Sequence, residues 1–360
     1  WQLNFNQSLD VIADNNKGKY KHFMLKEIME QPKTFELALK QDTKLLYSLA
    51  MEILRAHNVI LTGCGTSRFA GLIGRYLLSQ FDNKISEVIV GSELHYFTSP
   101  MSDDTVIIAV SQSGETADIL QAIKQAKEKG VKVISIVNRN NSSLERVSDY
   151  VINMKCGSEI GVAATKSFTS ELAIFYLLAF TMANKLDVGR SELKKIPDSI
   201  REVLKIRQTI NKVAHKIKDS EHIYYIGKGI NFSVAGECSL KLKEISYIHA
   251  ESMSAGELKH GTLSLVDKGT PIIGLCPDDI TYQEVINNLI EAKARNGYII
   301  GISDKYNKVY DEWLRIPKVN PIFYPVVTSV VGQLLAYYTA VARGLNADMP
   351  KSLAKSVTVL

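Results

Sequence analysis

The clearest feature of the hydrophobic pattern is an unbroken apolar run at Thr105–Val110. β-branched residues dominate the run and no polar residue alternates with them, which predicts a strand buried on both faces, as in a parallel sheet. Apolar residues then recur with helical spacing up to a stop near Gly130, at Ala117, Leu120, Ala122, Ile123 and Ala126. The polar segment Ser111–Thr116 therefore joins the carboxyl end of a strand to the amino end of a helix.

The rest of the first half repeats this alternation of strands and helices. Residues 1–57 are mostly polar with helical spacing, and a helix running from Glu27 is expected to end at Pro32. Further strands are predicted at 58–63, 88–90, 131–137 and 149–153, and helices at 72–78 and 172–183. Strands that alternate with helices predict an α/β fold with a doubly wound parallel sheet.

The second half resembles the first. Ile223–Gly229 resembles Val59–Gly65, and Asp267–Leu275 resembles Asp103–Val110. The interval of about 165 residues indicates a tandem domain duplication rather than a solenoid. Where the first copy has Ser111–Gly114, the second has Cys276-Pro-Asp-Asp, which repels an anion or cannot donate to it. We therefore expect one phosphate site, in the first copy, and a different role for the second.

Composition adds the cellular context. The chain has 360 residues, 46% hydrophobic and 22% charged, with a net charge of +5 that mildly favours an anionic ligand. We expect no nucleic acid partner, because no long basic run is present, and no membrane span, because no apolar run is long enough. Four scattered cysteines indicate reduced thiols and a cytoplasmic protein, not a zinc site. The start is neither a secretory signal nor a transit peptide, and without Met it suggests a piece of a longer chain.

The segment Ser111–Thr116 has the chemistry of an anion site. Free backbone N–H groups and the positive end of the helix dipole meet there, hydroxyls add donors, and Gly114 permits close approach. The segment contains no lysine, which argues against a Walker-type nucleotide loop and favours a small phosphorylated metabolite. The alternative is an ordinary helix cap followed by Glu115.

Four other places carry candidate chemistry, each with a plainer alternative. Cys64–Ser67 could contact the ligand or be a tight glycine turn with a serine cap. Lys241 and Glu244 share a helix face, as a catalytic pair or a surface ion pair. His260 precedes a glycine, as at many helix ends, and Lys355 could be an ordinary tail lysine. The residues alone leave these alternatives open.

Two motifs together, Gly63–Ser67 and Ser111–Thr116, resemble a pair of sugar isomerase (SIS) domains. Five further segments resemble the isomerase part of the glutamine–fructose-6-phosphate aminotransferases, or glucosamine-6-phosphate synthases: Lys21–Pro32, Glu159–Lys166, Glu244–Glu251, Gly256–Gly261 and Leu353–Val359. The resemblance covers essentially the whole chain in order. It implies two tandem SIS subdomains, each a doubly wound parallel sheet flanked by helices, with boundaries at 1–187, 188–344 and a tail at 345–360. The family's amino-terminal glutaminase domain is missing, and the segment from Trp1 resembles the connector.

The resemblance also implies roles for individual residues. The sugar phosphate would be bound by Ser67, Ser111, Gln112, Ser113 and Thr116. The sugar would be contacted by Cys64, Gly65, Thr66, Val162, Ala163 and Ala164, the last standing where the family often has Ser. Glu244 would be the enolisation base with Lys241 beside it, His260 would assist ring opening from the neighbouring subunit, and Lys355 would form a Schiff base with the sugar ketone. The apolar tail residues Leu353, Ala354, Val357, Val359 and Leu360 predict that the tail packs into the active site.

The function implied is conversion of fructose 6-phosphate, with ammonia, to glucosamine 6-phosphate by a homodimer. Alone, the chain would isomerise hexose phosphates, including glucose 6-phosphate, but could not hydrolyse glutamine. No metal, flavin, nicotinamide or pyridoxal phosphate is implied. The alternatives are an SIS deaminase or deglycase acting on amino-sugar or ketosamine phosphates, or a non-catalytic sugar-phosphate sensor.

Overall fold

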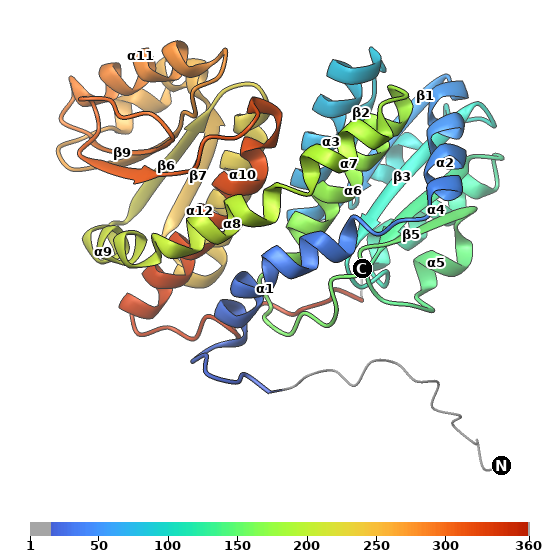
Figure 1. The fold of residues 1–360 in the computed structure, drawn as a ribbon, viewed down its shortest axis with the longest axis horizontal. Coiled ribbons are helices and arrows are strands. Elements are labelled where there is room, and N and C mark those ends of the chain that lie inside the picture. The colour runs from blue at the N-terminus through green and yellow to red at the C-terminus, as the bar shows by residue number, and fades with distance from the viewer. Residues whose placement is uncertain (1–15, 359–360) are drawn as a thin grey trace.

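The computed structural model describes residues 16–358 and contains two five-stranded parallel sheets (Figure 1). The first has the strand order β2-β1-β3-β4-β5 and the second β7-β6-β8-β9-β10. The two sheets therefore follow the same path, which confirms the predicted duplication and the doubly wound α/β class. The strands are β1 Asn58–Gly63, β2 Glu87–Val90, β3 Thr105–Ser111, β4 Lys132–Val137, β5 Tyr150–Asn153, β6 His222–Gly227, β7 His249–Ser254, β8 Pro271–Leu275, β9 Tyr298–Ser303 and β10 Glu312–Arg315.

Helices surround and separate the sheets. In chain order the α-helices are α1 Phe23–Ala38, α2 Thr43–Arg55, α3 Thr66–Asp82, α4 Ala117–Lys127, α5 Ser143–Val147, α6 Lys166–Met182, α7 Leu186–Leu193, α8 Ile196–Lys205, α9 Arg207–Ile217, α10 Ile230–Ser246, α11 Tyr282–Lys293 and α12 Tyr324–Ala342. Four 3₁₀ turns complete the described elements: η1 Leu94–Phe97, η2 Ala255–His260, η3 Thr262–Leu265 and η4 Pro321–Phe323.

The two sheets share one large core between them. Alternate residues of β3, such as Ile108 and Val110, join this core together with α3 and α6, whereas Ile107 and Ala109 face α4 on the outer side. The second sheet does the same with α10 and α12 inside and α11 outside. Since both faces of each sheet are covered, the strands are apolar throughout, as the sequence predicted for β3. Helices α3 and α10 pack against each other where the halves meet (Figure 1).

The expected helix end at Pro32 is wrong, because α1 continues through this proline to Ala38. Proline lacks the N–H that would reach the carbonyl of Ile28 four residues earlier. The side-chain amide of Gln31 donates to that carbonyl instead, at 3.1 Å. A neighbouring side chain thus replaces the lost hydrogen bond, and the helix continues.

The expectation that no segment is apolar enough for a membrane also needs correction. The stretch Pro321–Ala342 is long and apolar enough by length and composition, but 83% of its most apolar window is buried inside the fold. It forms η4 and α12, which pack against α8, α9 and α10. We interpret it as a core helix, and its uniform hydrophobicity reflects burial on all sides.

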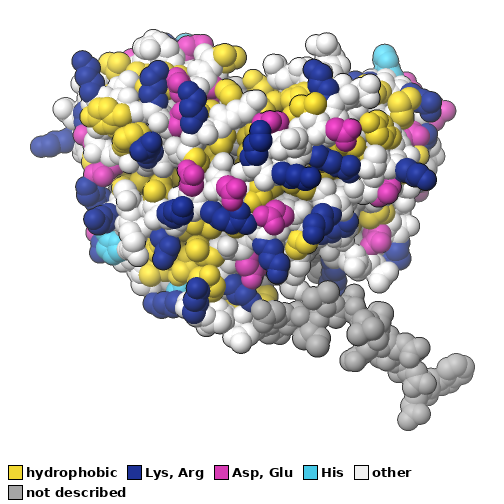
Figure 2. Space-filling view, in the orientation of Figure 1, with side chains coloured by type: hydrophobic (Ala, Val, Ile, Leu, Met, Phe, Trp, Pro, Cys, Tyr) yellow, Lys and Arg dark blue, Asp and Glu magenta, His cyan; other side chains and the backbone are white. Residues whose placement is uncertain are grey.

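Figure 2 shows the face that carries α1, α7 and α8. Lys and Arg side chains are interspersed there with Asp and Glu. Several charged residues of these helices form ion pairs. Arg201 on α8, for example, donates to Glu36 at 2.9 Å and to Asp198 at 2.5 Å. This view therefore shows a mixed, solvated surface.

Candidate active site

A cavity of about 310 Å³ opens at the carboxyl ends of β1 and β3. In a sheet of this strand order these two strands are where the chain path reverses, and ligands of such sheets bind in the crevice there. Residues far apart in the sequence meet around it: Cys64, Gly65, Thr66, Ser67, Val110, Ser111, Gln112, Ser113, Thr116, Asp118, Val162, Ala164, Lys241, Glu244, Leu353, Ala354, Lys355, Ser356 and Val357.

The loop after β3 forms one wall of the cavity. The Gly114 N–H donates to the Ser111 hydroxyl at 3.0 Å, and the hydroxyls of Ser111 and Thr116 lie 3.2 Å apart. Gly114 has φ of 65°, and a Cβ there would lie 2.2 Å from the Ser142 hydroxyl, so glycine is required. The loop thus holds several hydroxyls at the amino end of α4, with the geometry of an anion site.

The turn after β1 brings two hydroxyls onto two buried carboxyl groups. Ser67 donates to Glu171 of α6 at 2.8 Å, and Thr66 donates to Glu237 of α10 at 3.2 Å. Burial raises the pKa of each carboxyl to about 8. Each therefore holds its proton at neutral pH, and the Oε2 atom of each has no partner among the described residues.

Lys241 and Glu244 form a close pair on α10 that faces the same cavity. The Lys241 Nζ donates to Glu244 Oε2 at 2.6 Å and to the Thr66 hydroxyl at 2.8 Å, and lies 3.6 Å from Glu237. Burial alone would lower the pKa of Lys241, but the neighbouring Glu237 and Glu244 raise it. The Lys241 side chain is 1% exposed and that of Glu244 is 21% exposed. The ammonium therefore stays charged, and Glu244 keeps access to the cavity.

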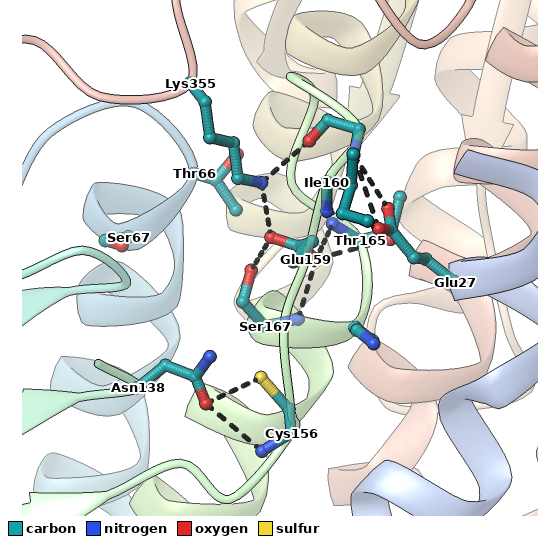
Figure 3. Close-up of polar contacts among 12 residues, drawn as sticks. Glu27, Thr66, Ser67, Asn138, Cys156, Glu159, Ile160, Thr165, Ser167 and Lys355 are labelled. Atoms are coloured by element: carbon teal, nitrogen blue, oxygen red, sulfur yellow. Dashed lines mark hydrogen bonds and ion pairs between the residues drawn. The ribbon is translucent and has the colours of Figure 1, made fainter. Parts of the chain in front are cut away.

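Lys355 is held by an inward-facing ion pair. Its Nζ lies 2.7 Å from Glu159 Oε2 and donates to the Gly161 carbonyl at 2.8 Å (Figure 3). Glu159 is fully buried and also accepts from the backbone and hydroxyl of Thr165 and Ser167. Although burial opposes its charge, Lys355 and these donors lower the pKa of Glu159 to about 2. A terminal lysine that is three-quarters buried on a carboxylate is not an ordinary tail lysine.

The tail closes over the cavity through polar contacts. Ser356 donates to the Ser113 hydroxyl at 3.1 Å, and the Val357 carbonyl accepts from Ala117 N at 3.2 Å. The expected apolar packing is wrong within the described residues, since Leu353 and Val357 are 47% and 52% exposed. Backbone and hydroxyl groups and the Lys355–Glu159 ion pair hold the tail instead. Val359 and Leu360 lie outside the described residues.

Two of the predicted site residues do not line this cavity. His260 ends η2 in the second half, is exposed, and is followed by Gly261. Ala163 is 2% exposed and belongs to the core, whereas its neighbours Val162 and Ala164 line the cavity. Every other predicted binding or catalytic residue lines the cavity.

Sequence reasoning missed the buried carboxyl groups behind the cavity, although signals existed for three of them. Glu237 lies one helical turn before Lys241, and Glu171 is the one acidic residue of the strongly apolar helix α6. Glu159 lies in one of the segments that carried the family resemblance, without an assigned role. Sequence reasoning also missed Asp118, which is half-buried and lines the cavity, because a single acid in the first turn of a helix is common. Within residues 16–358, no group of three or more His, Cys, Asp or Glu side chains is arranged to hold a metal ion.

Comparisons with known proteins point to the same family. The SIS domain family model matches residues 52–181 and 216–343. Glutamine–fructose-6-phosphate aminotransferase (isomerizing) of Pyrococcus horikoshii is 43% identical over 350 residues, which are 95% of this chain and 58% of that protein. The enzyme of the same name from Aquifex aeolicus is 39% identical over 97% of this chain and 60% of its own length. The chain thus spans about three-fifths of these relatives.

Among solved structures, one similar chain is the C-terminal domain of glucosamine-fructose-6-phosphate aminotransferase from Francisella tularensis. The TM-score is 0.86 with 32% identity, and the match covers 92% of this chain and 99% of that one. The shared part is therefore a whole domain of the relatives. The chain belongs to the SIS domain family and, within it, to the carboxyl-terminal domains of the glutamine–fructose-6-phosphate aminotransferases.

Proposed function

We propose that the chain binds fructose 6-phosphate and catalyses the isomerase half of its conversion, with ammonia, to glucosamine 6-phosphate. One observation carries the proposal: the hydroxyl-rich loop, the Lys241–Glu244 pair and Lys355 all line one cavity although they come from three distant parts of the chain. An anion site beside an acid–base pair and an amine suits a phosphorylated sugar that must exchange protons and form an imine.

The phosphate would lie against Ser67, Ser111, Gln112, Ser113 and Thr116. Backbone N–H groups at the start of α4 and the loop hydroxyls would donate to its oxygens. Cys64, Gly65 and Thr66, with Val162, Ala163 and Ala164 opposite, would contact the sugar, Ala163 through its backbone. Burial and the nearby Asp118 raise the pKa of the Cys64 thiol, which suits a shaping role rather than a nucleophilic one.

Glu244 would carry the proton from C1 to C2 of the open-chain sugar. A carboxylate suits this task when it is open to the substrate, and the Lys241 amine holds the Glu244 carboxylate in place at 2.6 Å. Lys241 is also held by Thr66, so the sugar turn and the base are fixed relative to each other. Lys355 would add to the ketone carbon, with loss of water, to give an imine.

The remaining roles concern partners. His260 would reach the active site of the neighbouring subunit of a homodimer and assist ring opening. This role suits a histidine that is exposed and does not line the cavity of its own chain. The ammonia would come from a glutaminase domain, and the protein would work in the cytoplasm. Glucose 6-phosphate would be the product of isomerisation without ammonia. The subdomain boundaries at residues 187 and 344 remain predictions.

An assay of hexose-phosphate interconversion, with and without ammonium ion, tests the reaction. Without ammonium ion, we expect fructose 6-phosphate to equilibrate with glucose 6-phosphate. With ammonium ion, we expect it to give glucosamine 6-phosphate. Release of ammonia from glucosamine 6-phosphate with no hexose isomerisation would favour a deaminase instead. Binding of sugar phosphates without any turnover would favour a sensor.

Reductive trapping tests the covalent step. Borohydride added with fructose 6-phosphate should leave a stable sugar adduct, which peptide mass mapping should place on Lys355. Lys355→Arg should abolish the adduct, because a guanidinium does not form such an imine. An adduct on Lys241 or Lys243 would contradict the assignment, and a normal isomerisation rate in Lys355→Arg would show that no imine is needed.

A further inference from the structure

Helix α1 contacts the loop that holds the tail lysine through Glu27, one turn in from the start of the helix. The Glu27 side chain is 2% exposed. Its Oε1 accepts from Ile160 N at 2.5 Å and from Gly161 N at 3.3 Å, and its Oε2 also lies 3.3 Å from Gly161 N. One buried carboxylate thus binds two successive backbone N–H groups of this loop (Figure 3).

The same loop holds Lys355 from its other side. The Gly161 carbonyl and the Glu159 carboxylate are the two acceptors of the Lys355 amine, at 2.8 and 2.7 Å. Glu27 binds the N–H groups at residues 160 and 161, between these two acceptors in the chain. A shift of the Glu27 carboxylate would therefore also move the Gly161 peptide group that binds the Lys355 amine.

The start of α1 is also attached to the base of the tail. Asp348 accepts from Phe23 N and Met24 N, each at 2.9 Å, so it satisfies two free N–H groups of the first turn. The Asp348 carbonyl in turn accepts from Val162 N at 3.0 Å. Loop, tail base and helix start therefore form one connected unit, and Glu27 is its attachment to the loop beside Lys355.

We propose that Glu27 is a positioning residue for Lys355, through which helix α1 sets where the amine stands in the cavity. The proposal rests on the proposed function in that Lys355 is taken to react with the sugar. Glu27 is not one of the hydrogen-bond partners of Lys355 and does not line the cavity, so we expect it to act through the Ile160–Gly161 backbone. A positioned amine reacts faster because the orientation is fixed before the substrate arrives.

A simpler role for Glu27 would be to fill space in the core. The cost of burying a carboxyl group argues against that role. Burial and the nearby Glu159 raise the pKa of Glu27 to about 7. Burying this carboxyl group therefore costs free energy, which a side chain that only fills space would not need to do. An apolar side chain would fill the same volume without this cost. The two backbone donors of the loop need an acceptor, and among the described residues Glu27 supplies it.

The test uses the full chain with three variants and one control. Glu27→Ala removes the acceptor, and Glu27→Gln keeps the shape but replaces one acceptor oxygen with a donor. Gly161→Ala acts from the loop side, because its new Cβ would lie 2.9 Å from Glu27 Oε2 and displace the carboxylate. Glu30→Gln is the control: it is on the same helix, but its partner at 2.8 Å is Lys166, not the loop.

The first readout needs no sugar. The rate at which an amine-acylating reagent labels Lys355 is measured by mass spectrometry, relative to the exposed Lys243 of the same molecules. We expect severalfold faster labelling of Lys355 in Glu27→Ala and Gly161→Ala, an intermediate rate in Glu27→Gln, and the wild-type rate in Glu30→Gln. An unchanged ratio in any folded Glu27 or Gly161 variant overturns the proposal, so failure of one variant to fold leaves the test intact.

The second readout separates positioning from stability. We expect kcat for isomerisation to fall by up to about 10²-fold in Glu27→Ala, the scale of misplacing a reacting group by roughly 1 Å. KM for fructose 6-phosphate should change little, because the phosphate loop is untouched. Parallel losses in kcat and in the folded fraction would overturn the positioning role. An inactive wild-type protein would refute the proposed function, whereas the labelling result still decides whether Glu27 positions Lys355.

Discussion

The two halves of the molecule have the same fold and different chemistry at the corresponding place. The glycines that cap α3 and α10, Gly65 and Gly229, have nearly the same backbone angles, with φ of 53° and 57° and ψ of −123° and −131°. The glycines that end β1 and β6 are equally tight, because a Cβ on Gly63 or Gly227 would lie within 2.8 Å of the following turn. The duplicated backbone was thus retained around both sheet crevices.

The loops after β3 and β8 differ. In the first half, the loop offers the hydroxyls of Ser111, Ser113 and Thr116 to the cavity. In the second half, Asp279 fills the equivalent place with its own carboxylate, which accepts from Thr281 N at 2.7 Å and from Asn231 Nδ2 at 2.8 Å. A carboxylate already occupies these donors, and its charge opposes a phosphate. The fold therefore supplies the crevice in both halves, whereas the loop side chains determine whether a crevice suits an anion.

The second half contributes Lys241 and Glu244 to the lining of the first half's cavity. Lys241 and Glu244 lie near the end of α10, which packs against α3. Gln80 of α3 and Glu244 of α10 lie the same number of residues after the glycines that cap their helices. Gln80 is exposed and does not line the cavity. On the proposed function, divergence after duplication would have divided binding and proton transfer between the two copies.

The sharpest division between the copies is at Glu244. Glu244→Gln keeps the shape but cannot accept a proton, so we expect isomerisation to fall by roughly 10²–10⁴-fold with fructose 6-phosphate still bound. Steady-state assays and calorimetry measure the two effects. Gln80→Ala, at the corresponding position of α3, should change neither. Near-normal turnover of Glu244→Gln would reduce Glu244 to an ion-pair partner of Lys241.

The next largest effect should come from the phosphate loop. Ser113→Ala removes one hydrogen bond to a charged group, which is worth roughly 1.5–3 kcal/mol, so we expect a 10- to 100-fold weaker Kd for fructose 6-phosphate. Every phosphorylated ligand should weaken by a similar factor, whereas the unphosphorylated sugar should not. Unchanged affinity for fructose 6-phosphate would place the anion site elsewhere.

A change in the second copy's loop, at Asp279, should affect stability alone. Asp279→Ala leaves the donor of Asn231, which is fully buried, without its partner, so we expect a loss of roughly 1–3 kcal/mol in the free energy of unfolding. Urea denaturation measures the loss, and the Kd for fructose 6-phosphate should stay at the wild-type value. A large change in that Kd would mean that both crevices take part in binding.

Much of this division could be predicted from the sequence. The buried strands and the duplication follow from hydrophobic periodicity, and the missing hydroxyls at Cys276–Asp279 indicated that only one copy binds phosphate. Helix α1 was mispredicted because the Gln31 side chain repairs the break at Pro32, which is a tertiary detail that no local rule includes. The inward-facing tail lysine was expected both from the family resemblance and from the apolar residues around it.

The arrangement of the groups behind the cavity could not be predicted, because it depends on three-dimensional contacts. Glu27, Glu159 and Glu171 come from separate segments, and nothing in their spacing shows that they back the same cavity. The tail was expected to be held by apolar residues, yet hydroxyl and backbone groups hold it. Polar contacts between distant segments leave no periodic trace in a sequence, whereas buried strands and helices do.

The smallest expected effect compares the central helices of the two halves. Both α6 and α12 are almost entirely buried, but α6 contains Glu171 and α12 has no charged side chain. Because burial raises the pKa of Glu171 to about 8 from 4.5, the folded state holds its proton more tightly than the unfolded state. Its contribution to stability is therefore full below about pH 4.5 and is lost as the pH rises through 8. Glu171→Gln, which cannot ionise, should lose less unfolding free energy between pH 5 and pH 8 than the wild type does, as measured by urea denaturation at both values. Equal losses in the two proteins would mean that Glu171 is already ionised in the fold, with a counter-charge near its Oε2 atom.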